Sequence, residues 1–166
     1  MYRLADCYSK LGQDSPAFNT YRMLLNEVQT GEFVGSAAFR LASRAFDQKD
    51  YGSAANLYEK AYDNSKSSEV KITALYYQAK SLELMNRKSE ARPIYEEVAK
   101  TGENNPFRDA ARLSVAYFAL ENGQKDSALD LFRSLGADAA KPAVRVEALV
   151  RAGILGEDLK KRDESE

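Results

Sequence analysis

The fold is decided by residues 34–67, VGSAAFRLASRAFDQKDYGSAANLYEKAYDNSKS. Apolar residues recur in this stretch three or four positions apart, first as Leu41, Ala42, Ala45 and Phe46 and then as Ala54, Leu57, Tyr58 and Ala61. This spacing places them on one face of an α-helix and does not fit the alternation of a β-strand. Lys49-Asp50 separates the two runs. The stretch therefore predicts two helices joined by a short turn.

The same pattern returns every 37 residues along the chain. The positions at this step are Ala17, Ala54, Ala91 and Ala128; Tyr21, Tyr58, Tyr95 and Phe132; Ala5, Ala42, Ala79 and Ala116, followed by Gly153; and Ala37, Ala74, Ala111 and Ala148. Such a fixed period is the signature of a repeat architecture. It predicts repeats at about 1–33, 34–67, 68–104 and 105–139, followed by a C-terminal capping helix at about 141–161.

Each repeat is expected to be a pair of antiparallel helices, which gives about nine helices and no strands. The expected pairs are 1–12 with 15–30, 34–49 with 51–64, 69–86 with 89–101, and 106–123 with 125–136. Asp14 or Ser15, Asp50, Ser89 and Asp126 are the predicted N-caps, because their side chains can accept a hydrogen bond from a free backbone N–H. Pro93 lacks an N–H group, and it suggests that the helix around it begins late.

Composition excludes several classes of function. The chain has 166 residues and a net charge of -1, so it lacks the positive charge that drives binding to nucleic acids. It contains one cysteine and no histidine, which excludes disulfides within the chain, most zinc sites and imidazole bases. No glycine-rich phosphate loop and no calcium-binding loop occurs. We therefore expect no enzyme activity, no catalytic residues, no metal and no cofactor.

The sequence also lacks the features of a membrane-inserted protein. No run approaches the roughly 20 apolar residues that span a bilayer. The first residues, Met1 to Asp6, do not have the layout of a signal peptide. Two interpretations stay open, a cytoplasmic protein or a segment of a longer one, and in the second case the compartment can be the periplasm or cell envelope.

The order of Ala42, Ala54, Tyr58 and Ala61 resembles the tetratricopeptide repeat. The resemblance implies a right-handed α-solenoid that forms one domain over residues 1–166 and acts as a protein–protein interaction scaffold. The usual repeat has 34 residues. The longer repeats here are similar to those of bacterial cell-envelope proteins, such as the lipoprotein partner of the outer-membrane assembly machine and the periplasmic coordinator of envelope constriction. This second resemblance implies the C-terminal part of a longer envelope-associated protein.

In this family the first helix of each pair lines a concave groove, which takes an extended or helical segment of a protein partner. Transferred to this sequence, the groove positions are Phe39, Ser43, Phe46, Asp47, Tyr76, Lys80, Glu83, Leu84, Leu113, Tyr117, Leu120 and Glu121. The alternative is a scaffold that assembles with copies of itself and has no foreign ligand. The tyrosines at step 37 are interpreted as core, and Cys7 as a small buried residue.

Overall fold

The computed structural model describes residues 1–102 and 105–163, which form nine helices and no strand. The helices are α1 (Tyr2–Lys10), α2 (Asp14–Glu27), α3 (Glu32–Asp47), α4 (Tyr51–Asn64), α5 (Ser68–Leu84), α6 (Lys88–Lys100), α7 (Arg108–Glu121), α8 (Lys125–Asp138) and α9 (Pro142–Asp163). The predicted all-α repeat fold is confirmed, with every helix end within about three residues of its expected place. The end of the third predicted repeat, residues 103–104, lies outside the described residues.

The turn inside each helix pair has the same geometry in all four repeats. A residue with positive φ ends the first helix, and these residues lie at step 37: Gly12, Lys49, Asn86 and Gly123. In the second repeat the N–H of Lys49 donates to the carbonyl of Phe46 and that of Asp50 to the carbonyl of Ala45, both at 2.9 Å. This is the Schellman arrangement, which satisfies carbonyls left free at the end of a helix. The repeat period is thus encoded in the turn as well as in the core.

The turn also explains which predicted N-caps are wrong. Asp50 is an N-cap, because its side chain accepts from the N–H of Ser53 at 3.1 Å. The helices α6 and α8 begin at Lys88 and Lys125, so the predicted caps Ser89 and Asp126 lie inside their first turns. Gln13 takes the cap position of α2, in place of Asp14 or Ser15. The Schellman turn restarts the chain directly after the residue with positive φ, which fixes these starts one or two residues earlier than expected.

Pro93 does not delay its helix, contrary to the prediction. It lies in the interior of α6, which begins five residues before it. The N–H of Ala91 already donates to the carbonyl of Arg87 at 3.1 Å. The helix is therefore established before the proline, which removes one hydrogen bond without ending it.

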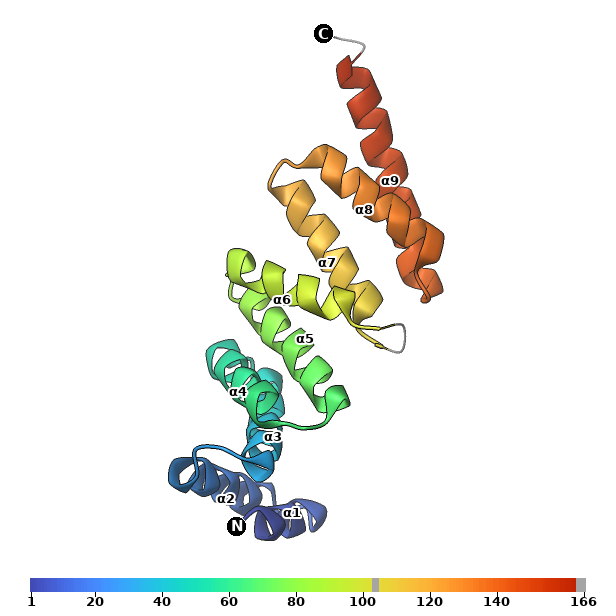
Figure 1. The fold of residues 1–166 in the computed structure, drawn as a ribbon. Helices are drawn as coiled ribbons and strands as arrows, with labels where there is room; N and C mark the ends of the chain where they lie inside the picture. Colours follow the sequence, from blue (N-terminus) through green and yellow to red (C-terminus); the bar gives the residue numbers. More distant parts are fainter. Residues whose placement is uncertain (103–104, 164–166) are drawn as a thin grey trace. The chain divides into compact units, whose positions relative to one another are not determined.

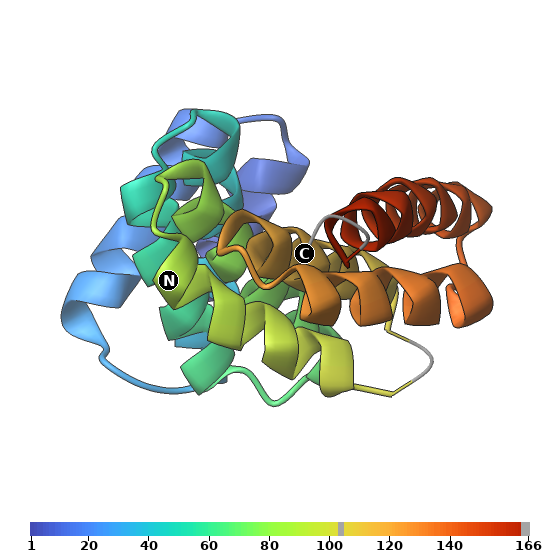
Figure 2. The same ribbon diagram turned by 90° about the horizontal axis from the view of Figure 1, so that it is seen from above.

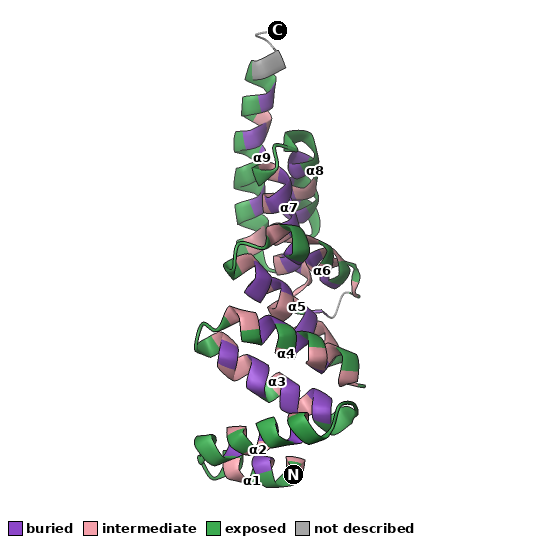
Figure 3. Cartoon of the chain, turned by 90° about the vertical axis from the view of Figure 1, so that its left-hand side faces the viewer, coloured by how far each residue is buried: buried purple, intermediate pink, exposed green. Residues whose placement is uncertain are grey.

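The helices group into two compact units, residues Met1–Ile94 and Tyr95–Glu166. In the first unit, α1 to α5 follow one another as hairpins, with α3 packed against both α2 and α4 (Figure 1). The alanines at step 37 are buried where these helices meet, and Tyr21 and Tyr58 are 1% and 2% exposed. Buried residues turn toward the neighbouring helices and exposed ones away from them (Figure 3). The expected single domain over the whole chain stays a prediction.

The second unit contains the end of α6 with α7, α8 and α9. The helices α8 and α9 lie side by side (Figures 1 and 2). Ala116, Ala128, Phe132 and Ala148 belong to one buried cluster there. In both units the alanine and aromatic positions predicted as core are buried, as expected.

Cys7 corrects a prediction, because its side chain is exposed. Its counterparts one, three and four repeats on are Arg44, Phe118 and Leu155, and the last two are buried. Phe118 contacts Tyr95 of the preceding hairpin, with ring centroids 6.0 Å apart. Cys7 therefore lies on the side of α1 that corresponds to the side of α7 on which Phe118 packs against the preceding hairpin.

Candidate interaction surface

The predicted groove residues of the first unit come from α3 and α5. We call them the first-helix face, which consists of Phe39, Ser43, Phe46 and Asp47 on α3 and Tyr76, Lys80, Glu83 and Leu84 on α5. Asp47 and Leu84 are exposed and the other six are half-buried. The face is therefore most accessible at the C-terminal ends of its two helices, where Asp47 and Leu84 lie.

The aromatic side chains of this face also hold the hairpins together. The ring of Phe39 meets Tyr58 edge-on, with centroids 5.8 Å apart. Phe46 meets Tyr51 at 5.5 Å and Tyr77 at 5.2 Å, again in T-shaped geometry. Aromatic pairs of this kind add about 0.5–1.5 kcal/mol beyond their buried area. These rings therefore have a structural role whether or not a partner binds them.

Tyr77 is the contact that sequence reasoning missed. It stacks on Tyr58 with centroids 5.6 Å apart and planes 23° apart, and it also contacts Tyr76 at 5.4 Å. Tyr77 is not one of the residue types that recur every 37 positions, because the residues 37 positions before and after it are Arg40 and Ser114. The signal that could have found it is the adjacent pair Tyr76-Tyr77, because neighbouring residues of a helix point about 100° apart and can serve two faces.

Ser43 connects the first-helix face to the buried tyrosine of its own repeat. Its hydroxyl oxygen accepts a hydrogen bond from the Tyr58 hydroxyl at 3.4 Å. Burial raises the pKa of Tyr58 to about 12, an effect that the hydrogen bond with Ser43 partly offsets. Burial likewise raises the pKa of Tyr76. Both phenols therefore stay neutral at physiological pH.

Charged side chains on the first-helix face are partly paired. Lys80 Nζ lies 2.9 Å from Glu83 Oε2, one turn along α5. The two side chains are 35% and 23% exposed, so the pair is accessible to water and contributes little to stability. It gives the α5 part of the face one donor and one acceptor side by side.

A pocket of about 350 Å³ opens beside the α3 part of this face. Its lining comes from α1, α2 and α3 and consists of Ser9, Asp14, Phe18, Tyr21, Arg40, Ser43, Arg44, Asp47 and Gln48. The guanidinium of Arg44 lies over the Phe18 ring at 4.1 Å. Tyr21 has a buried hydroxyl without a hydrogen-bond partner among the described residues, and burial raises its pKa. The pocket therefore combines charges of both signs with uncharged polar and aromatic groups.

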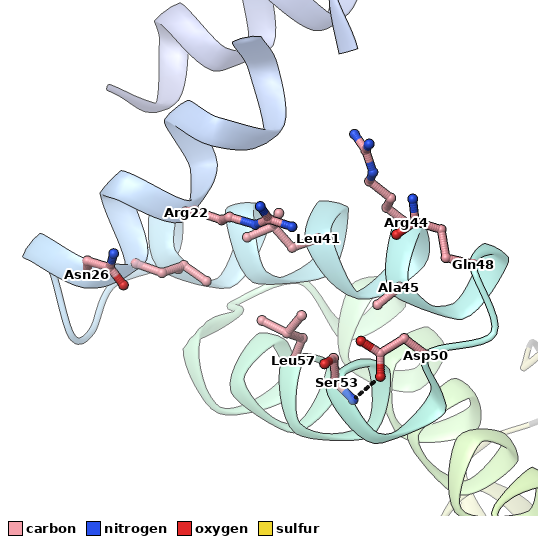
Figure 4. A pocket seen from close by; sticks show the side chains of 10 residues that line it. Arg22, Asn26, Leu41, Arg44, Ala45, Gln48, Asp50, Ser53 and Leu57 are labelled. Carbon is pink, nitrogen blue, oxygen red and sulfur yellow. Dashed lines mark hydrogen bonds between the residues drawn. The ribbon is translucent and has the colours of Figure 1, made fainter. Parts of the chain in front are cut away.

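A second pocket, of about 290 Å³, lies among α2, α3 and α4 and contains none of the predicted groove residues (Figure 4). Arg22, Leu41 and Leu57 are among its lining residues. Its carboxylate, Asp50, is already engaged as the N-cap of α4 through Ser53. Because this carboxylate already accepts a hydrogen bond from α4, the second pocket has fewer polar groups available for a ligand than the first one.

The predicted groove residues of the second unit are Leu113, Tyr117, Leu120 and Glu121 on α7. Leu113, Tyr117 and Leu120 pack against the core of this unit and Glu121 is exposed. Tyr117 meets Phe132 edge-on at 5.4 Å. Its hydroxyl donates to Glu147 and accepts from Arg151 Nε at 3.0 Å, both on α9. Tyr117 is therefore engaged within the chain, and burial together with Glu147 raises its pKa.

The described residues contain no group of three or more His, Cys, Asp or Glu side chains that could hold a metal ion. Among the same residues, no helix combines the length and the apolar character needed to cross a membrane.

Two segments of this chain match the tetratricopeptide repeat family. The matched residues are 1–28 and 73–101. The first segment contains α1, its turn and α2, and the second contains α5 from residue 73 onward, its turn and α6. Tetratricopeptide repeats generally mediate protein–protein interactions and are typically not enzymes. No curated protein matches the chain.

The fold is that of solved TPR-like repeats. A Podosopora anserina protein assigned as a kinesin light chain, with nearly identical TPR-like repeats, superposes with a TM-score of 0.64. It is 17% identical, and the match covers 98% of this chain and 87% of that one. A point variant of the same protein gives a TM-score of 0.63 at 17% identity, covering 98% and 86% of the two chains. At this identity the likeness shows the fold alone.

Proposed function

We propose that this chain is an interaction module that binds an extended or helical segment of a partner protein on the first-helix face of its first unit. The observation that carries the proposal is the pocket of about 350 Å³ beside α3, whose lining includes Ser43 and Asp47 of that face. A peptide suits this mixed lining, because it brings side chains together with backbone donors and acceptors.

The chemistry of the pocket favours a peptide with polar and charged side chains at this point. Arg40 and Asp47 are both exposed and lie two turns apart on α3, so they can pair with opposite charges on a partner. The half-buried rings of Phe39 and Tyr76 offer apolar area with little loss of side-chain entropy. A segment with apolar and charged residues in alternation meets both requirements.

Charge reversal on the exposed residues tests this proposal without disturbing the core. Peptides are selected from a displayed random library on the unaltered chain, and their affinity is then measured for the variants Asp47→Lys and Arg40→Glu. We expect each variant to weaken the selected peptides by about tenfold or more, since the loss of a charge-assisted contact costs about 1.5–3 kcal/mol. Asp63→Lys is the matched control, because Asp63 is an exposed carboxylate on α4. If the selected peptides bound the parent, both variants and the control equally well, binding at the first-helix face would be contradicted.

Association of the chain with copies of itself is the second candidate function. An apolar pocket of about 330 Å³ is lined by Met1, Tyr2, Arg3, Leu24 and Phe33. Leu4 and Phe33 are 51% and 55% exposed. Sedimentation velocity over a range of concentrations decides between the candidates, because a chain that stays monomeric excludes self-assembly.

The placement of the chain in a longer bacterial envelope-associated protein is also a proposal. Its support is the period of 37 residues, which exceeds the usual 34 by nearly one helical turn. Fractionation of cells that express the complete gene product is the direct test, and recovery of that product in the cytoplasm alone would contradict the placement.

A further inference from the structure

The Tyr21 hydroxyl is buried and has no hydrogen-bond partner among the described residues. The side chain is 1% exposed, and it lines the pocket of about 350 Å³ beside α3. Buried polar groups normally have a partner, because a hydroxyl that loses its bonds to water and gains none destabilises the fold. Tyr21 therefore contributes a free hydrogen-bonding group to the wall of this pocket.

The next repeat shows how such a hydroxyl is satisfied within the chain. Tyr58 lies 37 residues further on, and its hydroxyl donates to Ser43 at 3.4 Å. The counterpart of Ser43 in the first repeat is Asp6, whose carboxylate is paired with Lys10 at 2.8 Å. Both charges of this pair act on Tyr21, with opposite signs. The acceptor that serves Tyr58 therefore has no equivalent for Tyr21.

Among the charged side chains that line the pocket, Arg40 is the one that acts on the Tyr21 hydroxyl. Burial is the largest cause of the raised pKa of Tyr21, and Arg40 acts against it. Asp14 and Asp47 line the same pocket but are not among the main causes of this shift. A cation therefore lies within electrostatic reach of the free hydroxyl. An anion that accepts a hydrogen bond from Tyr21 is attracted to both groups.

Other donors of the pocket are also available to a ligand. Arg40 and Arg44 lie one turn apart on α3, and neither forms an ion pair with another described residue. The guanidinium of Arg44 is held over the Phe18 ring at 4.1 Å. Ser43 accepts from Tyr58, so its own hydroxyl hydrogen remains for donation. These donors suit an ionised carboxylate, which accepts hydrogen bonds and donates none.

We propose that this pocket binds the side-chain carboxylate of a glutamate in the partner segment, with Tyr21 donating a hydrogen bond and Arg40 supplying the opposite charge. The proposal rests on the proposed function, because it concerns the same pocket. A glutamate side chain can carry its carboxylate to a buried hydroxyl while the peptide backbone stays at the mouth of the pocket. A C-terminal carboxylate would have to bring the backbone inside. Asp14 and Asp47 are exposed at helix ends, where basic neighbours of the glutamate can pair with them.

A double-mutant cycle between peptide and chain tests the proposal. Short random peptides displayed on phage are selected on the unaltered chain, and the tightest one is synthesised with a free and with an amidated C-terminus. Each of its glutamates is changed to glutamine in turn, and affinities are measured by fluorescence anisotropy. We expect one glutamate whose change weakens binding to the parent by about tenfold or more, as for the loss of a charge-assisted contact. On Tyr21→Phe this ratio of affinities should fall at least about threefold, because the hydroxyl no longer distinguishes the two peptides.

Tyr58→Phe is the matched control, because the Tyr58 hydroxyl is already engaged by Ser43. This variant should leave the ratio unchanged. Tyr21→Phe should melt at or above the temperature of the parent, since it removes a buried hydroxyl that has no partner among the described residues. A loss of peptide discrimination in Tyr21→Phe is then not a consequence of unfolding.

Three results overturn the proposal: a tightest peptide without a glutamate, a ratio that is the same for the parent and Tyr21→Phe, or an affinity that requires the free C-terminus and no glutamate. In each case the proposed function still stands if Asp47→Lys and Arg40→Glu weaken the peptide. If neither charge reversal weakens any selected peptide, the proposed function is contradicted and this inference with it.

Discussion

Tyr58 of α4 stacks on Tyr77 of α5, with ring centroids 5.6 Å apart and planes inclined by 23°. The pair joins the second hairpin of the chain to the third within the first unit. Through Tyr77 it also reaches Phe46 at 5.2 Å, so residues of three helices share one aromatic cluster. The contact between these two hairpins therefore depends on Tyr77, a residue type that does not recur every 37 positions.

Replacement of Tyr77 by alanine should destabilise the chain substantially. The variant loses ring contacts with Tyr58, Phe46 and Tyr76, and truncation of a large packed aromatic residue typically costs about 3–5 kcal/mol; half-burial places Tyr77 near the lower value. Urea denaturation followed by circular dichroism measures the change. Leu84→Ala on the same helix is the control and should change stability by no more than about 0.5 kcal/mol, because Leu84 is exposed. A Tyr77→Ala variant as stable as this control would contradict the cluster.

Ala54→Leu should destabilise the crossing of α3 and α4. Ala54 is 0% exposed and packs in the cluster with Ala42 and Tyr58, so there is no room for three further carbon atoms. Overpacking of this kind costs about 1–3 kcal/mol. Thermal melts of Ala54→Leu and of Ala137→Leu, an exposed site near the end of α8, make the comparison. Coincident melts would show that the crossing is not close-packed.

The raised pKa of Tyr58 predicts a loss of stability in alkali. Its pKa is about 12 in the folded state and about 10 when exposed, so the folded state favours the neutral phenol. The contribution is complete below pH 10 and disappears as the pH rises toward 12, because the unfolded chain then ionises first. Because one pKa unit corresponds to about 1.4 kcal/mol, the loss amounts to at most about 3 kcal/mol. Between pH 9, 10.5 and 11.5, the urea midpoint should fall less steeply for Tyr58→Phe than for the parent. If the midpoints of the two proteins fell equally steeply, the raised pKa of Tyr58 would be contradicted.

Asp109 is predicted to stabilise the entry into α9. Its side chain is buried, and Oδ2 accepts from the N–H groups of Ala140 at 2.7 Å and Lys141 at 3.2 Å. Asp109→Ala leaves both donors without this partner and should cost about 1.5–3 kcal/mol. Asp126→Ala, at an exposed aspartate of α8, is the control. Equal urea midpoints for the two variants would show that water replaces the carboxylate at no cost.

The sequence predicted the fold well because one period constrains many positions at once. Ala54 and Tyr58 recur with their counterparts in every repeat, and spacing alone identifies them as core. The N-caps at Ser89 and Asp126 were wrong because the Schellman turn, and not side-chain preference, decides where the second helix begins. The exposure of Cys7 depends on which helices pack against α1, and no local pattern records that.

The candidate surfaces were less predictable than the core. Tyr117 was predicted as a groove residue from the family resemblance. Its hydroxyl is engaged by Glu147 and Arg151, which lie 30 and 34 residues further along the chain. The pocket beside α3 brings Asp14 and Arg40 together from two repeats. Each of these features depends on which helices are neighbours, which a single repeat does not reveal.

The most direct test of the central claim is to map a bound peptide on the chain by NMR. A library-selected peptide is titrated into isotope-labelled protein, and the shifts of backbone amides are followed. The account predicts the largest shifts at Phe39, Ser43, Asp47 and Tyr76, on the first helices of the second and third repeats. Shifts confined to the second helices α2 and α4 would contradict it.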